Sequence, residues 1–182
     1  MRRTLVIAAN VFREVIRDRV LYLIILFALL MVAAVRLLPE LAATPEDKII
    51  RDVGLAGMTV LGLVVAIFVG TGLVNKEIEK RTVLVMLAKP ISRVEFIVGK
   101  HLGLSMVLAV LVAAMTAIYM AILSVNRIAY PVTAILVSAV FLWLLLSLMT
   151  AVAIAFGVFT SSLLATLLTF TVFLMGSASA NL

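Results

Sequence analysis

Few side chains in this chain could carry catalytic or metal-binding chemistry. Its 182 residues include one histidine, His101, and no cysteine, which excludes a multi-histidine metal centre, a thiolate metal site and a disulfide framework. Gly99 and Lys100 adjoin, but a phosphate-binding G-x-x-x-x-G-K-[ST] loop would need a glycine at Val94 and a hydroxyl at His101. No combination of serine, histidine and acid suits hydrolysis. The sequence therefore predicts a chain that binds no cofactor itself and is not an enzyme.

Charged side chains gather in one polar interruption, residues 75–103, between two long apolar stretches. It carries six of the fifteen lysines and arginines. Residues 75–81 are predicted to be helical, with Glu77 and Arg81 one turn apart, where such a pair contributes about 0.3–0.5 kcal/mol. Because each flank is long enough to cross a bilayer, we expect the interruption to lie at one membrane face, as a contact surface for a partner in the water.

The middle of this interruption is a short apolar run, TVLVMLA at residues 82–88. A free helix of that length is unstable in water, so it must lean on a partner. The partner is either the membrane surface or a groove on another protein. The flanking charges, with Lys89 and Pro90, favour the groove, into which residues 82–88 would fit as a rigid projection that we call the docking knob. The predicted docking residues are Glu77, Glu79, Lys80, Arg81, Thr82, Val83, Leu84, Met86 and Leu87.

A new helix is predicted to begin at Ser92. The serine hydroxyl would accept a hydrogen bond from the backbone N–H of Glu95, and the glutamate would accept one from Ser92, as in a capping box. Pro90 closes off the short run before it. The predicted corner of the segment therefore consists of Pro90, Ser92, Arg93 and Glu95.

The composition predicts an integral membrane protein of the all-α class. The chain is 65% hydrophobic and 13% charged, with a mean hydropathy of +1.32, whereas soluble domains average about 45–50% apolar and about 25% charged residues. Five spans are predicted in one domain, at residues 20–38, 53–74, 102–125, 132–159 and 163–182, joined by the segment 75–101. The basic residues lie beside spans and not on an aromatic-studded polar face, so no nucleic acid is expected as partner.

Residues 1–19 form a predicted amphipathic helix. Its apolar face would comprise Leu5, Ala8, Ala9, Phe12, Val15 and Ile16, and we expect it to lie flat in the headgroup region. A solvated cytosolic helix is the alternative. Two further local predictions are a helix start at residues 44–47, with Thr44 as cap and Pro45 in the first turn, and a tight turn at residues 126–131.

The distribution of lysine and arginine predicts the orientation. Eleven of the fifteen lie in the amino-terminal segment and in residues 75–103. These two regions share one side of the membrane because an even number of crossings separates them. The other four lie on the opposite side. By the positive-inside rule, the amino terminus and the segment 75–101 are cytosolic. We expect a multi-pass protein of the inner (cytoplasmic) membrane.

No ionisable side chain is predicted deep inside a span. Such a residue would cost about 2.5–3.5 kcal/mol on insertion scales and would mark an ion path. Its absence argues against a proton-coupled pump. His101 is a candidate proton switch at a membrane face, although we expect it to be solvated.

Small residues repeat at every fourth position in three predicted spans. Such ridges let helix backbones approach closely, and helix packing is favoured over a substrate path as their role. The ridges are Gly62, Ala66 and Gly70 in the second span, Ser105, Ala109, Ala113, Ala117 and Ala121 in the third, and Ser147, Ala151 and Ala155 in the fourth.

The segment NKEIEKRTVLVMLAKPISRVEFIVGKHLG resembles the signature of the type-2 (ABC-2) ABC transporter permeases, and ANVFREVIRDRVLYLI is similar to their interfacial elbow helix. In that signature an E-x-E-x-x-T run precedes a short apolar coupling helix, a proline, S-R-x-E-F and G-K. The matching residues are Glu77, Glu79, Thr82, Pro90, Ser92, Arg93, Glu95, Phe96, Gly99 and Lys100. With the order of spans, the resemblance covers essentially the whole chain.

The resemblance implies an export permease subunit that pairs with itself or with a related permease in membrane lipid. Two copies of a separate cytosolic ABC ATPase would bind ATP and magnesium. The family has six spans, so the sixth is expected to be missing from these residues. A non-transporting scaffold that docks a cytosolic regulator through residues 75–101 is the alternative, and a secondary carrier is weakened by the lack of buried ionisable groups. No residue selects a substrate.

Overall fold

The computed structural model of the chain describes residues 2–16, 20–41, 46–79 and 93–179, and within these ranges every regular element is a helix. The helices are α1 (Arg2–Val15), α2 (Leu21–Leu41), α3 (Glu46–Glu79), α5 (Arg93–Val125), α6 (Val132–Phe159) and α7 (Ser162–Ser179). The predicted all-α class is confirmed.

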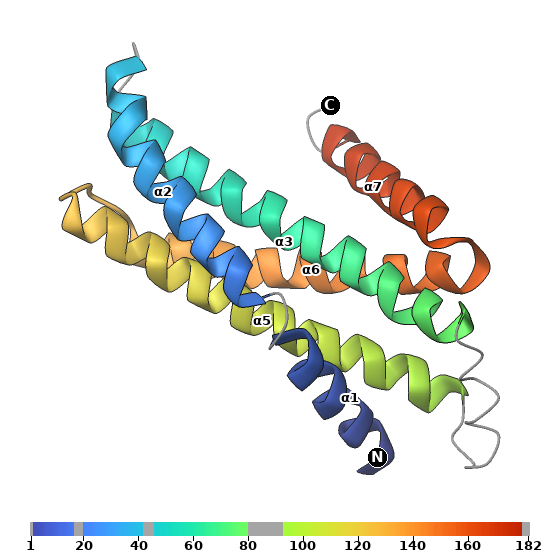
Figure 1. Ribbon diagram of the computed structural model, residues 1–182. Coiled ribbons are helices and arrows are strands. Elements are labelled where there is room, and N and C mark those ends of the chain that lie inside the picture. Colours follow the sequence, from blue (N-terminus) through green and yellow to red (C-terminus); the bar gives the residue numbers. More distant parts are fainter. Residues whose placement is uncertain (1, 17–19, 42–45, 80–92, 180–182) are drawn as a thin grey trace.

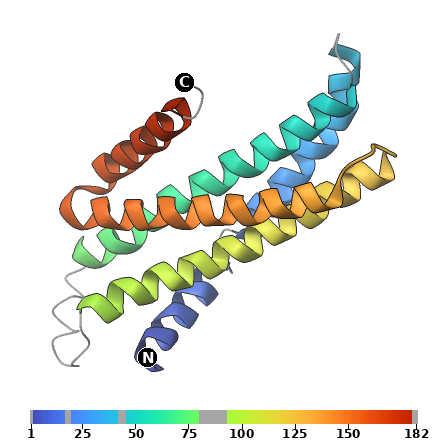
Figure 2. The same cartoon turned by 180° about the vertical axis from the view of Figure 1, so that it is seen from behind.

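Three long helices form the centre of the bundle (Figures 1 and 2). α3 packs on α5 and α6, and α5 also packs on α6. α2 lies against α3 and α5, α7 lies against α6 and α3, and α1 crosses α5. We call the end at which α3 ends and α5 begins the basic end, because residues 75–103 connect the two helices there. The opposite end, where α5 turns into α6, is the turn end.

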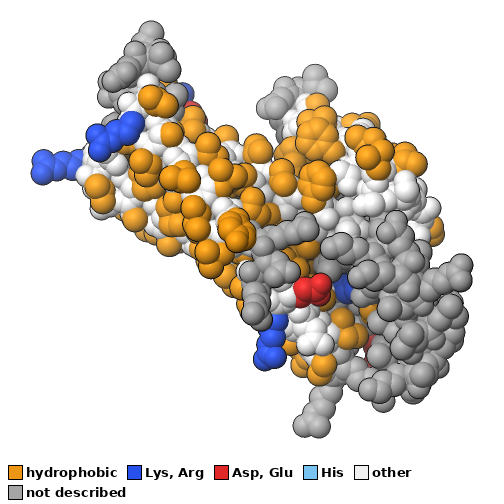
Figure 3. Space-filling view, in the orientation of Figure 1, with side chains coloured by type: hydrophobic (Ala, Val, Ile, Leu, Met, Phe, Trp, Pro, Cys, Tyr) orange, Lys and Arg blue, Asp and Glu red, His pale blue; other side chains and the backbone are white. Residues whose placement is uncertain are grey.

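The helix lengths and their apolar composition fit a multi-pass membrane protein. Four helical stretches are long and apolar enough to cross a bilayer: Lys48–Gly72, Val94–Val125, Val132–Phe159 and Ser162–Ser179. The first predicted span corresponds to α2, a helix of 21 residues whose apolar stretch Leu21–Leu37 is shorter. Figure 3 shows hydrophobic side chains over most of the visible described surface, as expected of helices that face lipid.

α3 and α5 are longer than a bilayer requires. They have 34 and 33 residues, which at about 1.5 Å per residue gives about 50 Å each, against roughly 30 Å of hydrocarbon. The polar residues of α5 before Leu102 place its extra length at the basic end, whereas α3 extends beyond its apolar run at both ends, with residues 46–52 at the turn end and 75–79 at the basic end. The sequence predicts that residues 75–81 continue the helix of the second span and that a new helix from Ser92 leads to the third, and in the described residues α3 reaches Glu79 and α5 runs unbroken from Arg93.

Most of the large buried side chains of the bundle belong to α5. Leu104, Leu108, Leu111, Met115 and Tyr119 of this helix are all fully buried. They meet Phe27 and Met31 of α2, Met58 of α3 and Leu146 of α6 in one hydrophobic core. The core thus centres on the helix that leaves the signature segment.

The predicted turn between α5 and α6 is present, and its hydrogen bonds define its type. The N–H of Ile128 donates to the carbonyl of Leu123 at 3.0 Å, and the N–H of Arg127 donates to that of Ser124 at 3.1 Å. These two bonds form a Schellman motif. Arg127 occupies the position at which glycine is usual, with a φ of 57°.

Three local predictions are refined by the structure. α3 begins at Glu46, while Thr44 and Pro45, the predicted cap, lie outside the described residues. The predicted break after the fourth span is present, because α6 ends at Phe159 and α7 begins at Ser162. Of the predicted apolar face of α1, Ala8 and Val15 are buried and Leu5 is 58% exposed, and its location in the headgroup region stays a prediction.

Candidate functional site

The predicted docking residues fall largely outside the described part of the chain. Glu77 and Glu79 lie in the last turns of α3, Arg93 begins α5 and Glu95 lies in its first turn. The remaining docking and corner residues lie outside the described residues: Lys80, Arg81, Thr82, Val83, Leu84, Met86, Leu87, Pro90 and Ser92. Their docking role stays a prediction, and the structure shows what holds the two ends of the segment.

α1 packs closely on the first turns of α5, at two glycines. A Cβ on Gly103 would lie 2.7 Å from the carbonyl oxygen of Ala8 and 2.9 Å from Cβ of Val11. A Cβ on Gly99 would lie 3.0 Å from Cβ of Ile7 and 3.1 Å from the carbonyl oxygen of Thr4. Only the absence of side chains at both glycines lets the two helices cross at this distance.

The buried stripe of α1 therefore differs from the predicted face. Ala8, Val11 and Val15 are buried, and they recur at three- and four-residue intervals as a packed helix face does. Leu5 and Ala9, which the periodicity assigns to the apolar face, are exposed. α1 rests on α5 through this stripe, and Leu5 and Val6 leave a second apolar strip uncovered by the described residues.

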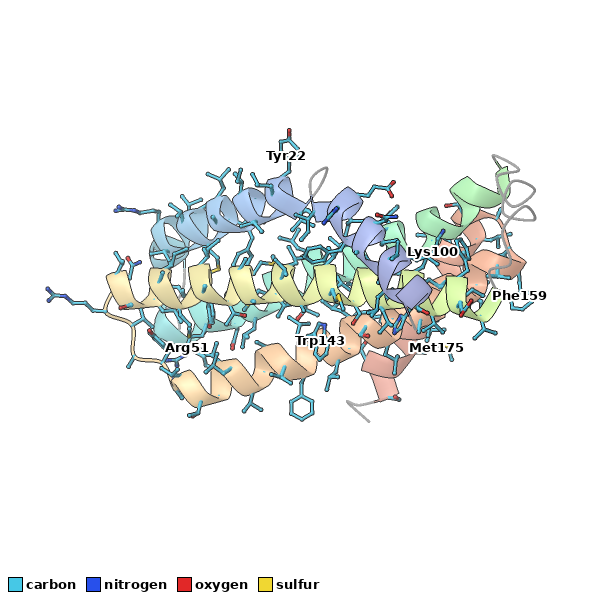
Figure 4. The ribbon with its side chains drawn as sticks, turned by 90° about the horizontal axis from the view of Figure 1, so that it is seen from below. Tyr22, Arg51, Lys100, Trp143, Phe159 and Met175 are labelled. Carbon is cyan, nitrogen blue, oxygen red and sulfur yellow. The ribbon has the colours of Figure 1, made fainter. Side chains whose placement is uncertain are left out.

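A buried lysine lies at the same crossing. Lys100 is 2% exposed, and its Nζ lies 4.5 Å from the centroid of the Phe96 ring one turn earlier. Figure 4 labels Lys100 beside α1, near the end of α3. Sequence reasoning placed Lys100 in a polar segment and missed its burial. The signal that could have found it is the glycine spacing of G-K-H-L-G, which predicts a close helix neighbour.

His101 is less solvated than the sequence suggests. The side chain is half-buried, and its Nδ1 atom is buried without a hydrogen-bond partner among the described residues. The expectation of a solvated histidine is therefore wrong for this atom.

At the turn end, polar contacts join α3 to α5 and to the turn between α5 and α6. Nη1 of Arg51 donates a 2.7 Å hydrogen bond to the carbonyl of Ala129 in the turn, and Oη of Tyr119 donates a 3.1 Å bond to the carbonyl of Arg51. Gly54 lies directly against the Tyr119 ring. These contacts join residues far apart in the sequence, which single-sequence patterns cannot pair.

The small-residue ridge of the second predicted span packs as expected. A Cβ on Gly62 would lie 2.5 Å from Cδ1 of Leu146, and one on Gly70 would lie 3.0 Å from Cβ of Ala153. Ala66 between them has no exposed surface. Helix packing is thus confirmed as the role of this ridge, which lies against α6.

The ridges of α5 and α6 behave differently. Ser105 is buried and its Oγ donates a 3.0 Å hydrogen bond to Oγ of Ser147, while Nε1 of Trp143 donates a 2.9 Å bond to the carbonyl of Ser105. Beyond this polar contact, the ridge members Ala113, Ala117, Ala121, Ala151 and Ala155 are exposed in this chain, and their packing role stays a prediction.

A groove of about 370 Å³ runs between α5 and α6 beside these alanines. Ala109, Ala113 and Ala117 line it from α5, and Val140 and Trp143 line it from α6. Figure 4 shows Trp143 between the two helices. The lining is almost entirely apolar, as expected of a surface within the hydrocarbon region.

The arrangement of the described residues suits the transmission of movement rather than catalysis or metal binding. In these ranges no group of three or more His, Cys, Asp or Glu side chains could hold a metal ion. α3 and α5, each about 50 Å long, both reach the basic end, and α1 is packed onto α5. Such an arrangement can transmit a displacement of the connecting segment into the membrane bundle.

Comparison with known protein families agrees with this architecture. Residues 5–179 match the family described as ABC-2 family transporter protein. No curated protein and no solved structure shows a significant match. The family match spans α1 to α7 and includes the segment that carries the signature residues. The chain therefore belongs to the ABC-2 transporter family and is a multi-pass membrane component of an ABC transporter.

Proposed function

We propose that the chain is the membrane-spanning permease subunit of an ATP-driven exporter, and that residues 75–101 dock it onto a separate cytosolic ABC ATPase. Family membership supports the permease role. The ATPase carries ATP and magnesium, so hydrolysis occurs on the partner. Two permease copies, identical or related, form the transport path in the inner membrane.

One observation carries this proposal beyond family membership. α3 and α5 both continue past the thickness of a bilayer core to the same end, where residues 80–92 join them. A helix transmits an axial or tilting force over its whole length because each turn is hydrogen-bonded to the next. A partner that moves residues 80–92 thereby moves two central helices of the bundle.

The charge distribution supports a cytosolic basic end. Eleven of the fifteen lysines and arginines lie in residues 1–19 and in residues 75–103. In the structure, α1 packs against the basic-end half of α5, which is consistent with both groups sharing one face. Under the positive-inside rule that face is the cytosol, where a soluble ATPase can reach it.

The test is capture and reconstitution. Affinity-purified full-length chain is expected to retain an ABC ATPase, and the permease is expected to change the ATP hydrolysis rate of that ATPase in proteoliposomes. Leu84→Asp, which puts a charge on the apolar knob, is expected to remove both effects. Glu79→Ala is expected to weaken the change in rate.

Matched controls lie at the turn end. Val125→Asp introduces the same charge at an 81% exposed position, and Asp52→Ala removes an exposed carboxylate. Both are expected to behave as wild type. If no ABC ATPase is retained, or if Leu84→Asp and Val125→Asp have equal effects, the proposal fails. Retention of a protein without nucleotide-binding motifs would instead support the scaffold.

A further inference from the structure

Gly99 and Lys100 of the signature lie near the end of residues 75–101, beyond the predicted docking residues 77–87, and the proposed function gives them no role of their own. Lys100 is nevertheless unusual. At 2% exposure it is the most buried charged side chain in the described part of the chain. It lies seven residues into α5, in the second turn after the segment proposed to dock the ATPase.

Burying an ammonium group is unfavourable unless neighbouring groups compensate for lost water. The Phe96 ring supplies one such compensation, because its centroid lies 4.5 Å from Nζ, within the range of a cation–π interaction. The two residues are one turn apart on the same face of α5. The S-R-x-E-F and G-K parts of the signature, separate in the sequence, thus meet in one contact.

The turns of α5 that carry this contact pack on α1. Gly99, directly before Lys100, lies against Ile7 and Thr4, and Gly103 lies against Ala8 and Val11. Neither position could accept a Cβ without displacing the backbone or side chains of α1. Figure 4 shows Lys100 at this crossing. The first turns of α5 therefore have one register on α1, with the buried cation between the two glycine contacts.

We propose that Lys100 is a positioning residue for energy coupling. Its contact with Phe96, one turn earlier on the same helix, stiffens the first turns of α5, so that a movement of residues 80–92 is transmitted to the bundle instead of being lost in bending of those turns. The inference rests on the proposed function and assigns a role to the G-K part of the signature. Lys100 contacts neither nucleotide nor ATPase in this role.

Lys100→Met keeps the length of the side chain and removes its charge, and Lys100→Arg keeps the charge and the affinity for an aromatic face. Each variant is reconstituted with the captured ATPase. We expect Lys100→Met to retain the ATPase as wild type does, while the permease-dependent change in hydrolysis rate falls about five-fold or more. Lys100→Arg is expected to restore most of it. Arg36→Met, which removes an exposed cation at the turn end, is the matched control.

The variant Phe96→Leu tests whether Lys100 acts through its contact with Phe96. If Lys100 acts through Phe96, Phe96→Leu alone gives the same defect, and adding it to Lys100→Met causes little further loss. Unfolding of every variant is followed by SDS titration.

Three outcomes overturn the inference. The first is an unchanged hydrolysis response in Lys100→Met. The second is a loss of folded protein in Lys100→Met that Lys100→Arg does not restore, because this would show that Lys100 has a structural role only. Strictly additive effects of Lys100→Met and Phe96→Leu would also contradict it. A wild-type chain that retains no ATPase would overturn the proposed function itself and this inference with it.

Discussion

Gly103 is the residue at which α1 comes closest to α5. The atom opposite it is a backbone carbonyl oxygen, 2.7 Å from the place a Cβ would occupy. A backbone group cannot rotate away as the end of a flexible side chain can. The close crossing therefore depends on the hydrogen atom that glycine presents.

Gly103→Ala is expected to destabilise the chain by about 1–3 kcal/mol, the usual cost of overpacking a tight contact. Gly176→Ala on α7 is the control, because no atom lies within 4 Å of the position its Cβ would take. In a helix, alanine alone is more favourable than glycine by up to about 1 kcal/mol, so the control should be neutral or stabilising. SDS-unfolding titrations in mixed micelles give both values, and equal stability of the two variants would contradict the close crossing.

At Arg127 the expected change in stability has the opposite sign, because here it is the introduction of a glycine that should stabilise the chain. Its φ of 57° is a conformation that glycine adopts freely and other residues adopt at a cost. We expect Arg127→Gly to stabilise the α5–α6 turn by about 0.5–1 kcal/mol, and Arg127→Val to destabilise it by about 1 kcal/mol or more. The same titration measures both. A stabilising valine would show that the turn adopts another conformation.

Some residue roles were predictable from the sequence and others were not. The packing of Gly62 and Gly70 follows from their spacing of eight along an apolar helix. The burial of Lys100 does not, because the turns of α5 around it pack on α1, over eighty residues earlier in the chain. Likewise, periodicity alone could not choose between Leu5 and Val11 on α1, since both are apolar and only the position of α5 decides which is covered.

At the scale of elements, the contact between α5 and α6 combines apolar packing with one hydroxyl pair. Ser105 and Ser147 are joined at 3.0 Å, and Trp143 donates to the backbone of the same turn. In a membrane, apolar packing competes with equally apolar lipid tails, so small residues and polar contacts determine which helices associate. This pair therefore fixes the register of the two helices.

A double-mutant cycle of Ser105→Ala and Ser147→Ala is expected to give an interaction free energy of about 0.6 kcal/mol, the average for hydrogen bonds between membrane helices. Tyr119→Phe, which loses the separate bond to Arg51, should be additive with either serine variant because the groups share no partner. SDS titration of the variants provides the cycle. A zero interaction energy for the serine pair would contradict the hydrogen bond.

The helices themselves were largely predictable, because long uncharged runs can only be spans. The predicted helix from Ser92 toward the third span is likewise present in its described part, because α5 runs unbroken from Arg93 through the polar residues before Leu102. The exposed alanines of α5 and α6 show the limit of small-residue patterns, which predict close packing without naming the neighbour.

At the scale of the whole molecule, the two ends of the bundle differ in construction. The turn end is closed by short connections and by the contacts of Arg51 and Tyr119. The basic end carries two helices longer than the membrane, with α1 packed against one of them. The proposed ATPase would act at that end, and the central helices would carry the movement across the membrane.

A site-specific cross-link tests this account most directly. The chain has no cysteine, so Met86→Cys and Val125→Cys each introduce one, in the proposed docking knob and at the turn end respectively. Each variant is labelled with a maleimide photo-crosslinker, illuminated in inner-membrane vesicles and its adducts identified by mass spectrometry. The account predicts an ABC ATPase joined to position 86 and none joined to position 125. An ATPase adduct missing at position 86, or equally abundant at both positions, would contradict it.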